Sequence, residues 1–415
     1  MLDIQFIREN AELVQRKAHE KGYKNVDVAA LLAADEQRRA QLTTVEDLRA
    51  QRNALTESMK GQKPSIEQIE QGKKLKEEIA IRENELKVTE GKWQSQMETV
   101  PNPAFDDVPL GGEEDSVEIK KVGEQTSGAK DHLDFATDRD WVDFERGAKV
   151  AGAKFYYLKG DLALLENAIT QYALDFVLKK DFTYLTVPHM VSSRMAAGAG
   201  FAPRGDESGN EYFVEGEDLT LIGTAEAPLT GYHADEIIDE DKLPLKYVGY
   251  SPCYRKEAGT YGKHTRGLFR VHQFNKLEMY IFCTPERSRE MHEFILQTEE
   301  ELWQALGVPY HVVNIAAGDL GAPAAKKYDV EYWSPVDQKY RELTSCSNCT
   351  DFQARNLNIR VRRKDGRVEA LHTLNGTAVS LARSLVAVIE HYQTERGTLR
   401  IPEVLQPYMG NRTEI

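Results

Sequence analysis

Apolar residues recur at intervals of three, four and seven between Val28 and Met97, in a stretch otherwise rich in charge. The seam residues are Leu42, Val45, Leu48, Leu55 and Met59, followed after a break by Leu75, Ile79, Leu86, Trp93 and Met97. This spacing is typical of the narrow apolar seam of a coiled coil. The pattern therefore predicts two long helices that pair along their apolar edges.

The segment between the two seams, residues 60–65, contains Gly61 and Pro64, which favour a chain reversal. Ser65, with Gln68 three residues later, has the pattern of a capping box. We therefore predict an antiparallel hairpin over residues 28–97 with its tip near 60–65, within an N-terminal helical domain of residues 1–105. Such a hairpin can serve as a spacer or dimerisation element, or as an arm that grips a partner.

Charge favours the second role, because the hairpin tip is basic in an acidic chain. The 415 residues carry a formal net charge of −14, which argues against general coating of nucleic acid. Residues 49–76 nevertheless hold seven basic and three acidic side chains, a net charge of +4. The basic ones are Arg49, Arg52, Lys60, Lys63, Lys73, Lys74 and Lys76. An acidic body with one basic projection fits an anionic partner that is contacted locally.

A linker punctuated by Pro103 and Gly111 precedes a second domain, expected over residues 115–415. Residues 161–179 have the apolar spacing of an amphipathic helix. The run 182–191 reads as a strand containing Pro188, which belongs at a sheet edge or an interface. Residues 196–210, rich in glycine and alanine, are expected to form a mobile loop.

The rest of the second domain contains short β-branched and aromatic runs without a regular alternation of strands and helices. The runs cover residues 246–250, 268–274, 277–282, 311–315, 330–333 and 358–363. This arrangement predicts an α+β fold in which helices pack on an antiparallel sheet. Neither GxGxxG nor GxxxxGK with a following Ser or Thr precedes a helix, so a Rossmann or P-loop nucleotide site is not indicated.

Four cysteines in 415 residues do not make a disulfide scaffold. Cys346 and Cys349 form one CxxC, but a tetrahedral zinc site needs four ligands and no second CxxC or HxxxH is present, so no zinc is expected. The sequence also shows no secretory signal and no apolar run near the roughly 18 residues that span a bilayer. We therefore expect a cytoplasmic protein without a membrane segment.

The most informative candidate chemistry lies around Arg255, between two apolar, strand-like runs. Arg255 closes the first run and Arg270 opens the second, so across a hairpin the two guanidinium groups can converge on one anion. Glu257 and Glu278 add acceptors for a cation or an amine. These residue types suit a substrate that has both phosphates and an amino group. The alternative is a solvated basic hairpin.

Three further segments place polar residues among apolar ones. Glu226 is expected to be partly buried and to need a partner, for which a local arginine would suffice. Glu342 and Ser345 offer the hard oxygens that Mg²⁺ prefers beside phosphates, although Glu-x-x-Ser is a common pattern. Arg383 lies in a mostly apolar helical run, so it must face a bound anion or a carboxylate of the protein.

These segments resemble the signature motifs of class II aminoacyl-tRNA synthetases, and specifically those of the seryl-tRNA synthetase family. Residues 161–191 resemble the first motif, residues 252–279 the second and residues 374–390 the third. Positions 378–382 depart from the family's pattern, mainly at small packing residues. The Glu-Leu-Thr-Ser-Cys-Ser-Asn signature at 342–348 continues into Asp351-Phe352-Gln353-Ala354-Arg355. The resemblance covers essentially the whole chain, up to Pro407-Tyr408-Met409.

The resemblance implies ATP- and Mg²⁺-dependent activation of L-serine to seryl-adenylate and transfer to the 3′ end of serine tRNA, with selenocysteine tRNA as a further acceptor to consider. It implies that Arg255 and Arg383 serve the α- and γ-phosphates and, with Glu342, carry the catalysis. The implied ATP-binding residues are Arg255, Lys256, Glu257, Arg270, Val271, Phe274, Glu342, Leu343, Thr344, Ser345 and Arg383. The implied serine-binding residues are Thr224, Ala225, Glu226, Arg255, Glu278, Asn375 and Thr377.

The same resemblance implies Mg²⁺ on Glu342 and Ser345, a homodimer built through residues 161–191, and tRNA binding by the seven basic residues of the hairpin. Three rivals are weighed against it. Amino acid:carrier-protein ligases share the catalytic domain but lack the long arm. A non-catalytic RNA-binding paralogue would have lost an arginine or a metal ligand, and all matched positions are filled. Threonyl-type specificity would require a zinc site.

Overall fold

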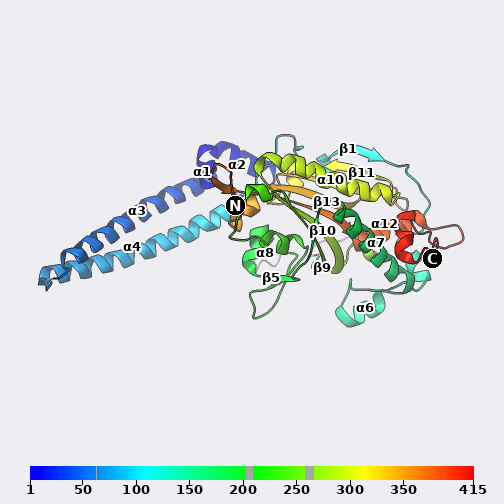
Figure 1. Cartoon of the computed structure of the whole chain (residues 1–415), viewed down its shortest axis with the longest axis horizontal. Helices are drawn as coiled ribbons and strands as arrows, with labels where there is room; N and C mark the ends of the chain where they lie inside the picture. Colours follow the sequence, from blue (N-terminus) through cyan, green and yellow to red (C-terminus); the bar gives the residue numbers. More distant parts are fainter. Residues whose placement is uncertain (62, 202–208, 258–265) are drawn as a thin grey trace. The chain divides into compact units, whose positions relative to one another are not determined.

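The computed structural model describes residues 1–415 except 62, 202–208 and 258–265, and it separates into two compact units (Figure 1). The first unit is Met1–Pro103 and the second is Ala104–Ile415. The sequence predicts that the first domain ends at residue 105 and that the second begins at residue 115, whereas the two units meet between Pro103 and Ala104. Within the described residues, no helix combines the length and the apolar character needed to cross a bilayer.

The first unit is entirely helical, with α1 (Ile4–Glu9), α2 (Ala11–Glu20), α3 (Val28–Ser58) and α4 (Ile66–Thr99). The long helices α3 and α4 lie side by side as a hairpin (Figure 1). Leu48, Leu75 and Ile79 form an apolar cluster along the predicted seam. Ser65 and Gln68 make the predicted capping box in both directions, which fixes the start of α4.

The second unit is built on an eight-stranded sheet within the described residues, with strand order β1-β11-β12-β13-β16-β10-β9-β4. Neighbouring strands pair antiparallel except β4 with β9, so the α+β prediction is confirmed. In that order the strands are β1 (Val117–Val122), β11 (Tyr310–Asn314), β12 (Lys326–Ser334), β13 (Lys339–Thr350), β16 (His372–Ser380), β10 (Gln273–Cys283), β9 (Leu245–Tyr254) and β4 (Thr183–Thr186).

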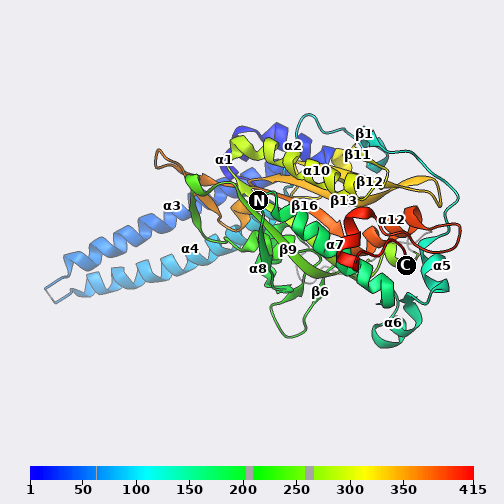
Figure 2. The same cartoon turned by 45° about the vertical axis from the view of Figure 1, so that its right-hand side comes forward.

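Three helices pack against one face of this sheet: α7 (Gly160–Leu178), α10 (Ser288–Ala305) and α12 (Leu381–Tyr392) (Figure 1, Figure 2). The core between sheet and helices includes Leu277, Met279 and Ile281 of β10, which alternate with side chains on the opposite face. These three helices therefore close one face of the central strands, while the shorter α9 and α11 cover part of the other face.

Smaller elements surround the sheet. The helices are α5 (His132–Asp138), α6 (Phe144–Ala151), α8 (Ser193–Ala199), α9 (Glu226–Gly231) and α11 (Phe352–Asn356). Short strands form the separate sheets β2 (Val142–Asp143) with β3 (Tyr157–Leu158), β5 (Met190–Val191) with β7 (Thr220–Leu221) and β6 (Tyr212–Phe213), and β15 (Val368–Ala370) with β14 (Arg360–Arg362) and β8 (Ile237–Asp239).

Three local predictions are wrong in detail. The run 268–274 is a 3₁₀ turn, η4 (Gly267–Phe269), followed by extended chain, and β10 begins only at Gln273. The run 182–191 is divided between β4 and β5 with Pro188 between them, although β4 does lie at the sheet edge as predicted. The expected loop 196–210 begins inside α8, because its alanines pack into a small apolar cluster with Ile222. Residues 202–208 of that loop lie outside the described residues.

Candidate active site

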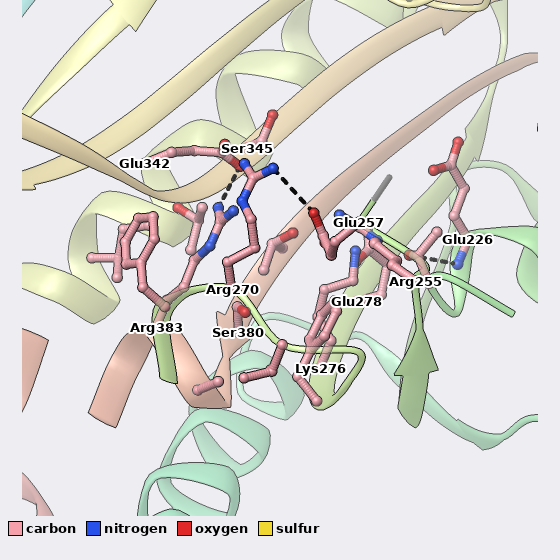
Figure 3. A pocket seen from close by; sticks show the side chains of 18 of the residues that line it. Glu226, Arg255, Glu257, Arg270, Lys276, Glu278, Glu342, Ser345, Ser380 and Arg383 are labelled. Atoms are coloured by element: carbon pink, nitrogen blue, oxygen red, sulfur yellow. Dashed lines mark hydrogen bonds and ion pairs between the residues drawn. The ribbon is translucent and has the colours of Figure 1, made fainter. Parts of the chain in front are cut away.

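A cavity of about 250 Å³ opens on the face of β10, β13 and β16 opposite α7, α10 and α12 (Figure 3). Its walls also include the chain that joins β9 to β10 and the first turn of α12. The cavity is lined by Phe201, Thr224, Glu226, Arg255, Glu257, Leu268, Phe269, Arg270, Val271, Phe274, Lys276, Glu278, Glu342, Leu343, Thr344, Ser345, Ser347, Asn375, Thr377, Ser380, Ala382 and Arg383.

The structure brings the predicted ATP and serine residues together, because all of them except Lys256 and Ala225 line this one cavity. Ala225 is fully buried beside α9, in the apolar cluster with Val187 and Leu229. The Lys256 ammonium lies 5.5 Å from the ring centre of Phe213. The loop residues 258–265 of the second motif lie outside the described residues.

Strand alternation explains part of the lining. Phe274, Lys276 and Glu278 are successive same-face residues of β10, and all three reach the cavity. The Lys276 ammonium forms an ion pair with the Glu278 carboxylate, and both side chains are buried. Sequence reasoning missed Lys276, although the two-residue period through Phe274 and Glu278 would have found it.

Two β-bulges supply the rest of the lining. In β13, Thr344 pairs with Val330 and Glu342 with Glu331, so Leu343 is an extra residue in the ladder. In β16, Ala378 is extra between the pairs that Thr377 and Val379 make with β10. A bulge shifts the alternation by one residue. Residues three apart, Glu342 with Ser345 and Thr377 with Ser380, therefore face the same cavity.

The arginines of the second motif lie on the cavity wall. Arg255 directly follows β9; its Nε donates to the carbonyl oxygen of Gly223 at 3.1 Å, and its guanidinium lies 5.3 Å from the ring centre of Phe274. Arg270 forms an ion pair with Glu257, with 3.1 Å between Nη1 and Oε2. The segment is therefore a cavity wall with partnered charges, and the structure does not support the alternative of a solvated basic hairpin.

Arg383 is the third residue of α12 and reaches the same cavity from the other side (Figure 3). Its Nη1 lies 2.7 Å from Glu342 Oε1, so the predicted carboxylate partner is present. Burial alone would raise the pKa of Glu342, but Arg383 and Lys327 outweigh it and lower the pKa to about 2. Glu342 is therefore an anion throughout the physiological range, and it faces the cavity beside a fixed cation.

The oxygens around Glu342 fit a hard divalent cation. Ser345 Oγ donates to Asp329 Oδ1 at 2.6 Å, which turns the lone pairs of the hydroxyl away from Asp329. Burial raises the pKa of Asp329, which is 5% exposed. The described residues contain no group of three or more His, Cys, Asp or Glu side chains that could hold a metal by themselves. A Mg²⁺ ion on Glu342 and Ser345 would then share its coordination with substrate phosphates and water.

Glu226 occupies the other end of the cavity. Its Oε1 accepts from Gln353 Nε2 at 2.7 Å and from Asn375 Nδ2 at 2.9 Å. Burial raises the pKa of Glu226 to about 7, and the nearby Glu278 carboxylate adds to this shift. The alternative of a local arginine partner is wrong, because two side-chain amides satisfy this oxygen instead.

Gln353 is a second residue that sequence reasoning did not single out. It is fully buried, and its amide nitrogen also donates to the carbonyl oxygen of Ala199 at 2.9 Å. Its carbonyl oxygen accepts from Tyr280 Oη at 2.8 Å and from Thr373 Oγ1 at 2.7 Å. Every hydrogen-bonding position of this amide is therefore filled, which holds its orientation toward Glu226 fixed.

The four cysteines are buried and free of disulfides. Cys349 Sγ accepts from Asn375 Nδ2 at 3.7 Å, so the second residue of the CxxC lies beside a cavity residue. In the first unit, the seven basic residues of the hairpin are all exposed. Arg49 pairs with Glu83 of the facing helix at 2.7 Å, and Lys60 pairs with Glu57 at 3.0 Å.

The antiparallel sheet, with arginines on both walls of a cavity over its central strands, has the architecture of a class II aminoacyl-tRNA synthetase core. Residues 212–392 match the model of the "tRNA synthetase class II core domain (G, H, P, S and T)". Residues 1–104 match the "Seryl-tRNA synthetase N-terminal domain".

Full-length relatives narrow this class. The chain is 47% identical to a serine–tRNA ligase of Dictyoglomus turgidum, over 99% of this chain and 98% of the relative. It is 44% identical to one of Treponema denticola, over 99% of both chains. A crystal structure of seryl-tRNA synthetase from Pyrococcus horikoshii, complexed with ATP, superposes with a TM-score of 0.92 at 41% identity, covering 100% of this chain and 99% of that one. The chain belongs to the seryl-tRNA synthetase family.

Proposed function

We propose that the chain is a serine–tRNA ligase, which uses ATP and Mg²⁺ to form seryl-adenylate from L-serine and then transfers the seryl group to serine tRNA. One observation carries the proposal. A single cavity has Arg255 and Arg383 on its walls, together with two acids, the half-buried Glu226 of α9 and the buried Glu278 of β10. The arginines suit the phosphates of ATP, and the acids suit the ammonium group of an amino acid, so the cavity can hold both substrates together. The named relatives of the chain support it.

The activation step asks the protein to position reactants and to neutralise charge. A carboxylate oxygen of serine attacks the α-phosphorus of ATP, the bond from that phosphorus to the β-bridging oxygen breaks, and pyrophosphate leaves. Arg255 stabilises the α-phosphate and Arg383 the γ-phosphate, while Phe274 stacks on adenine beside the Val271 backbone. Fixed cations in a partly buried cavity act where charge develops, without reorganising.

Glu342 and Ser345 would hold the magnesium ion, which supplies charge neutralisation across the phosphates when it is bound. The Arg383 guanidinium would compete with the magnesium ion for the Glu342 carboxylate, because it forms an ion pair with that carboxylate. We expect Arg383 to exchange this carboxylate for the γ-phosphate when ATP and Mg²⁺ enter together. Arginine suits such an exchange because its planar fork matches carboxylate and phosphate equally.

The serine pocket follows from the acids at the other end. Glu278 and Glu226 offer acceptors for the ammonium and the hydroxyl of serine, with Thr224, Asn375 and Thr377 around them. A substrate without the hydroxyl would leave a buried acceptor unpaired, which is the basis of strong discrimination. Alanine is therefore the informative competitor for this pocket.

We also propose that the protein acts as a homodimer through residues 161–191. Exposed apolar side chains on this segment support the proposal: Leu164 is 50% exposed, Tyr184 39% and Met190 45%. They lie on α7, the edge strand β4 and β5, and an edge strand has backbone groups ready to pair with another chain. A second copy of the chain is the proposed occupant.

The arm over residues 28–97 is proposed to bind serine tRNA in the cytoplasm, through the seven basic residues of its outer half. Whether selenocysteine tRNA is also an acceptor is decided by charging both transcripts in one assay. The charge distribution favours tRNA over a spacer role, because residues 49–76 around the tip carry a net charge of +4.

Serine-dependent exchange of pyrophosphate into ATP, measured with each of the twenty amino acids, tests the activity. We expect exchange with serine, and none with threonine or alanine at equal concentration. Charging of serine tRNA should follow with the same preparation. Absence of exchange with every amino acid would favour the non-catalytic RNA-binding alternative. Exchange without tRNA charging would favour a carrier-protein ligase.

A further inference from the structure

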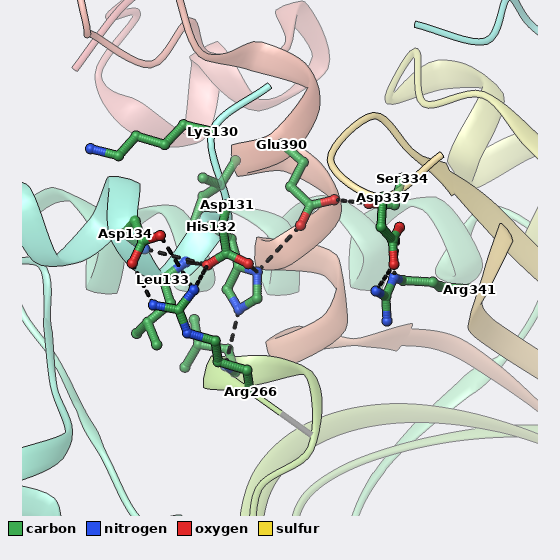
Figure 4. A network of polar contacts seen from close by, with 12 residues as sticks. Lys130, Asp131, His132, Leu133, Asp134, Arg266, Ser334, Asp337, Arg341 and Glu390 are labelled. Carbon is green, nitrogen blue, oxygen red and sulfur yellow. Dashed lines mark hydrogen bonds and ion pairs between the residues drawn. The ribbon is translucent and has the colours of Figure 1, made fainter. Parts of the chain in front are cut away.

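The chain from Gly267 to Arg270 forms one wall of the cavity, and its outer side rests on helix α5 (Figure 4). Leu268 is 1% exposed, and Gly267 has a positive φ of 64°. A Cβ at Gly267 would lie 2.4 Å from Nε2 of His132, the first residue of α5. The cavity wall and the imidazole ring are therefore packed in direct contact.

His132 is almost fully buried and has a polar partner on each ring nitrogen. The backbone N–H of Leu268 lies 3.3 Å from Nε2, and Glu390 Oε1 lies 3.3 Å from Nδ1. A backbone N–H can only donate, so Nε2 must be an acceptor. The ring is then neutral with its proton on Nδ1, and this Nδ1–H donates a hydrogen bond to Glu390 Oε1. One tautomer satisfies both partners.

The Glu390 side chain is also buried, and both of its oxygens have hydrogen-bond partners. Its other oxygen, Oε2, accepts from Ser334 Oγ at 2.7 Å and from Tyr332 Oη at 3.2 Å. Glu390 lies on α12, seven residues after Arg383. At about 3.6 residues per turn, seven residues make two turns, so both side chains leave the same side of the helix.

The wall and α12 are connected a second time through Phe269. The centre of its ring lies 5.0 Å from the Arg383 guanidinium and 5.4 Å from that of Arg341. At the other end of the wall, Arg266 pairs with Asp134 of α5. The segment that carries Arg270 is thus held by α5 and α12 together, and His132 is the group that touches both the wall and, through Glu390, the helix.

We propose that His132 is a positioning residue for ATP: it fixes the backbone of Leu268 and, through Glu390, sets the spacing between Arg270 and Arg383 across the cavity. The proposal rests on the proposed function of the cavity as the ATP site. Without the imidazole, a buried N–H and a buried carboxylate each lose a partner, and the wall is free to move relative to α12. Small displacements of positioned charges weaken phosphate binding steeply.

The test compares His132→Phe, which keeps a ring but loses both hydrogen bonds, with His132→Gln, whose amide can accept from Leu268 and donate to Glu390. In pyrophosphate exchange we expect H132F to raise the KM for ATP at least fivefold and to leave the KM for serine within twofold of wild type. Calorimetric titration with ATP alone should show the same loss in Kd. H132Q should recover at least half of the loss in ATP affinity that H132F causes, measured as the change in log Kd.

His391 supplies the matched control. It follows Glu390 on α12, it is half-buried, and its Nε2 donates to the carbonyl oxygen of Trp333 at 2.7 Å, away from the cavity wall. His391→Phe should lower the Tm without changing the KM for ATP. A merely structural histidine at 132 would behave in the same way.

An H132F protein whose KM and Kd for ATP stay within twofold of wild type overturns the proposal, as does a parallel rise of the ATP and serine KM values. If H132F does not fold, Glu390→Gln decides: at least a twofold rise in KM for ATP with an unchanged KM for serine supports the proposal, and no rise overturns it. Wild-type protein that binds ATP but shows no serine-dependent exchange refutes the proposed function, while the calorimetric comparison still tests His132.

Discussion

Two glutamates of the cavity show how strongly the surroundings decide what one residue type can do. Burial raises the pKa of both carboxyls, but Arg383 and Lys327 reverse the effect at Glu342 and lower its pKa to about 2. At Glu226, burial and the nearby Glu278 carboxylate outweigh the hydrogen bond that Gln353 donates, so its pKa rises to about 7. The phosphate end is therefore permanently charged, whereas the serine end changes its charge near neutral pH.

Arg255 is the residue on which adenylate formation should depend most. Arg255→Ala removes a charge-assisted contact to the α-phosphate, and we expect serine-dependent pyrophosphate exchange to fall by about 10²–10³-fold. The protein should remain folded, because the Arg255 side chain makes only one hydrogen bond within the described residues, to Gly223. Arg194→Ala, which breaks an exposed pair with Asp235, is the control. Exchange within threefold of wild type would refute the role of Arg255.

Glu278 should carry much of the choice of amino acid. Glu278→Gln changes an acceptor that is 2% exposed into an amide and leaves Lys276 without its carboxylate partner. We expect a higher KM for serine and a smaller ratio of kcat/KM for serine over alanine. The measurement is pyrophosphate exchange with both amino acids and with Glu226→Gln beside it. Unchanged selectivity in both variants would place the pocket elsewhere.

Glu226 also gives a pH-dependent stability. Its carboxyl keeps a proton in the folded protein between the ordinary pKa of 4.5 and about 7, where the unfolded chain has lost it. The folded state binds more protons in that window, so the free energy of unfolding falls as pH rises through it. At about 1.4 kcal/mol per pKa unit, the cost at pH 8 is at most about 3–4 kcal/mol.

Glu226→Gln removes this cost and keeps an oxygen for Gln353 and Asn375. We therefore expect the ligand-free variant to be more stable than wild type at pH 8, with the difference closing towards pH 5, in denaturant unfolding at both pH values. The exposed Glu124→Gln is the control and should show no such difference. A gap of equal size at pH 5 and pH 8 would contradict the assignment.

At the scale of elements, the long periodic segments were predictable and the short polar ones were not. The seam Leu48, Leu75 and Ile79 and the Ser65 cap mark α3 and α4 in the sequence, because packing along a coiled coil repeats the same spacing many times. β13 and β16 were not predicted as strands. Each contains a bulge at which cavity residues lie three apart, and that spacing hides the two-residue period.

The partners of the site were harder to find than its substrate-facing groups. Gln353 lies 127 residues from Glu226 in the chain, yet its amide holds that carboxylate. His132 lies 258 residues from Glu390. Such contacts depend on the tertiary fold, and no local sequence pattern around Gln353 or His132 predicts them. Lys276 is the exception, because strand alternation with Glu278 places it on the cavity face.

Gly376 is a position at which β16 is packed tightly against α10. A Cβ there would lie 2.2 Å from Ile295 Cγ2, 2.8 Å from Glu299 Oε1 and 3.0 Å from Cys346 Cβ. Gly376→Ala should therefore push strand and helix apart, destabilise the protein by about 1–3 kcal/mol and raise the KM for serine, because Asn375 and Thr377 flank this position. Urea unfolding and pyrophosphate exchange measure the two effects.

Gly91 of α4 is the matched glycine. A Cβ there has nothing within 4 Å, and Gly→Ala in a helix interior stabilises by about 0.5–1 kcal/mol. Gly91→Ala should leave serine activation unchanged. If Gly376→Ala is as stable as wild type, strand β16 can move away from α10, and the tight packing is not what positions Asn375 and Thr377.

At the scale of the whole molecule, chemistry and tRNA binding are assigned to separate compact units. All predicted catalytic residues lie beyond residue 220 in the unit Ala104–Ile415, and the basic hairpin lies in Met1–Pro103. Deleting about residues 40–85 and bridging α3 to α4 should leave serine-dependent pyrophosphate exchange nearly intact. Charging of serine tRNA should fall sharply. Equal loss of both activities would mean that the arm merely supports the fold.

Point variants sharpen the same prediction, because the seven basic residues are not equivalent. Arg49 and Lys60 already have acidic partners, whereas Lys63, Lys73, Lys74 and Lys76 show no ion pair within the described residues. Changing these four lysines to alanine should weaken tRNA binding and flatten its salt dependence, since fewer counterions are released. Lys87→Ala with Lys92→Ala, exposed on the same helix outside 49–76, is the control. Unchanged charging by the four-lysine variant would mean that the tip does not grip tRNA.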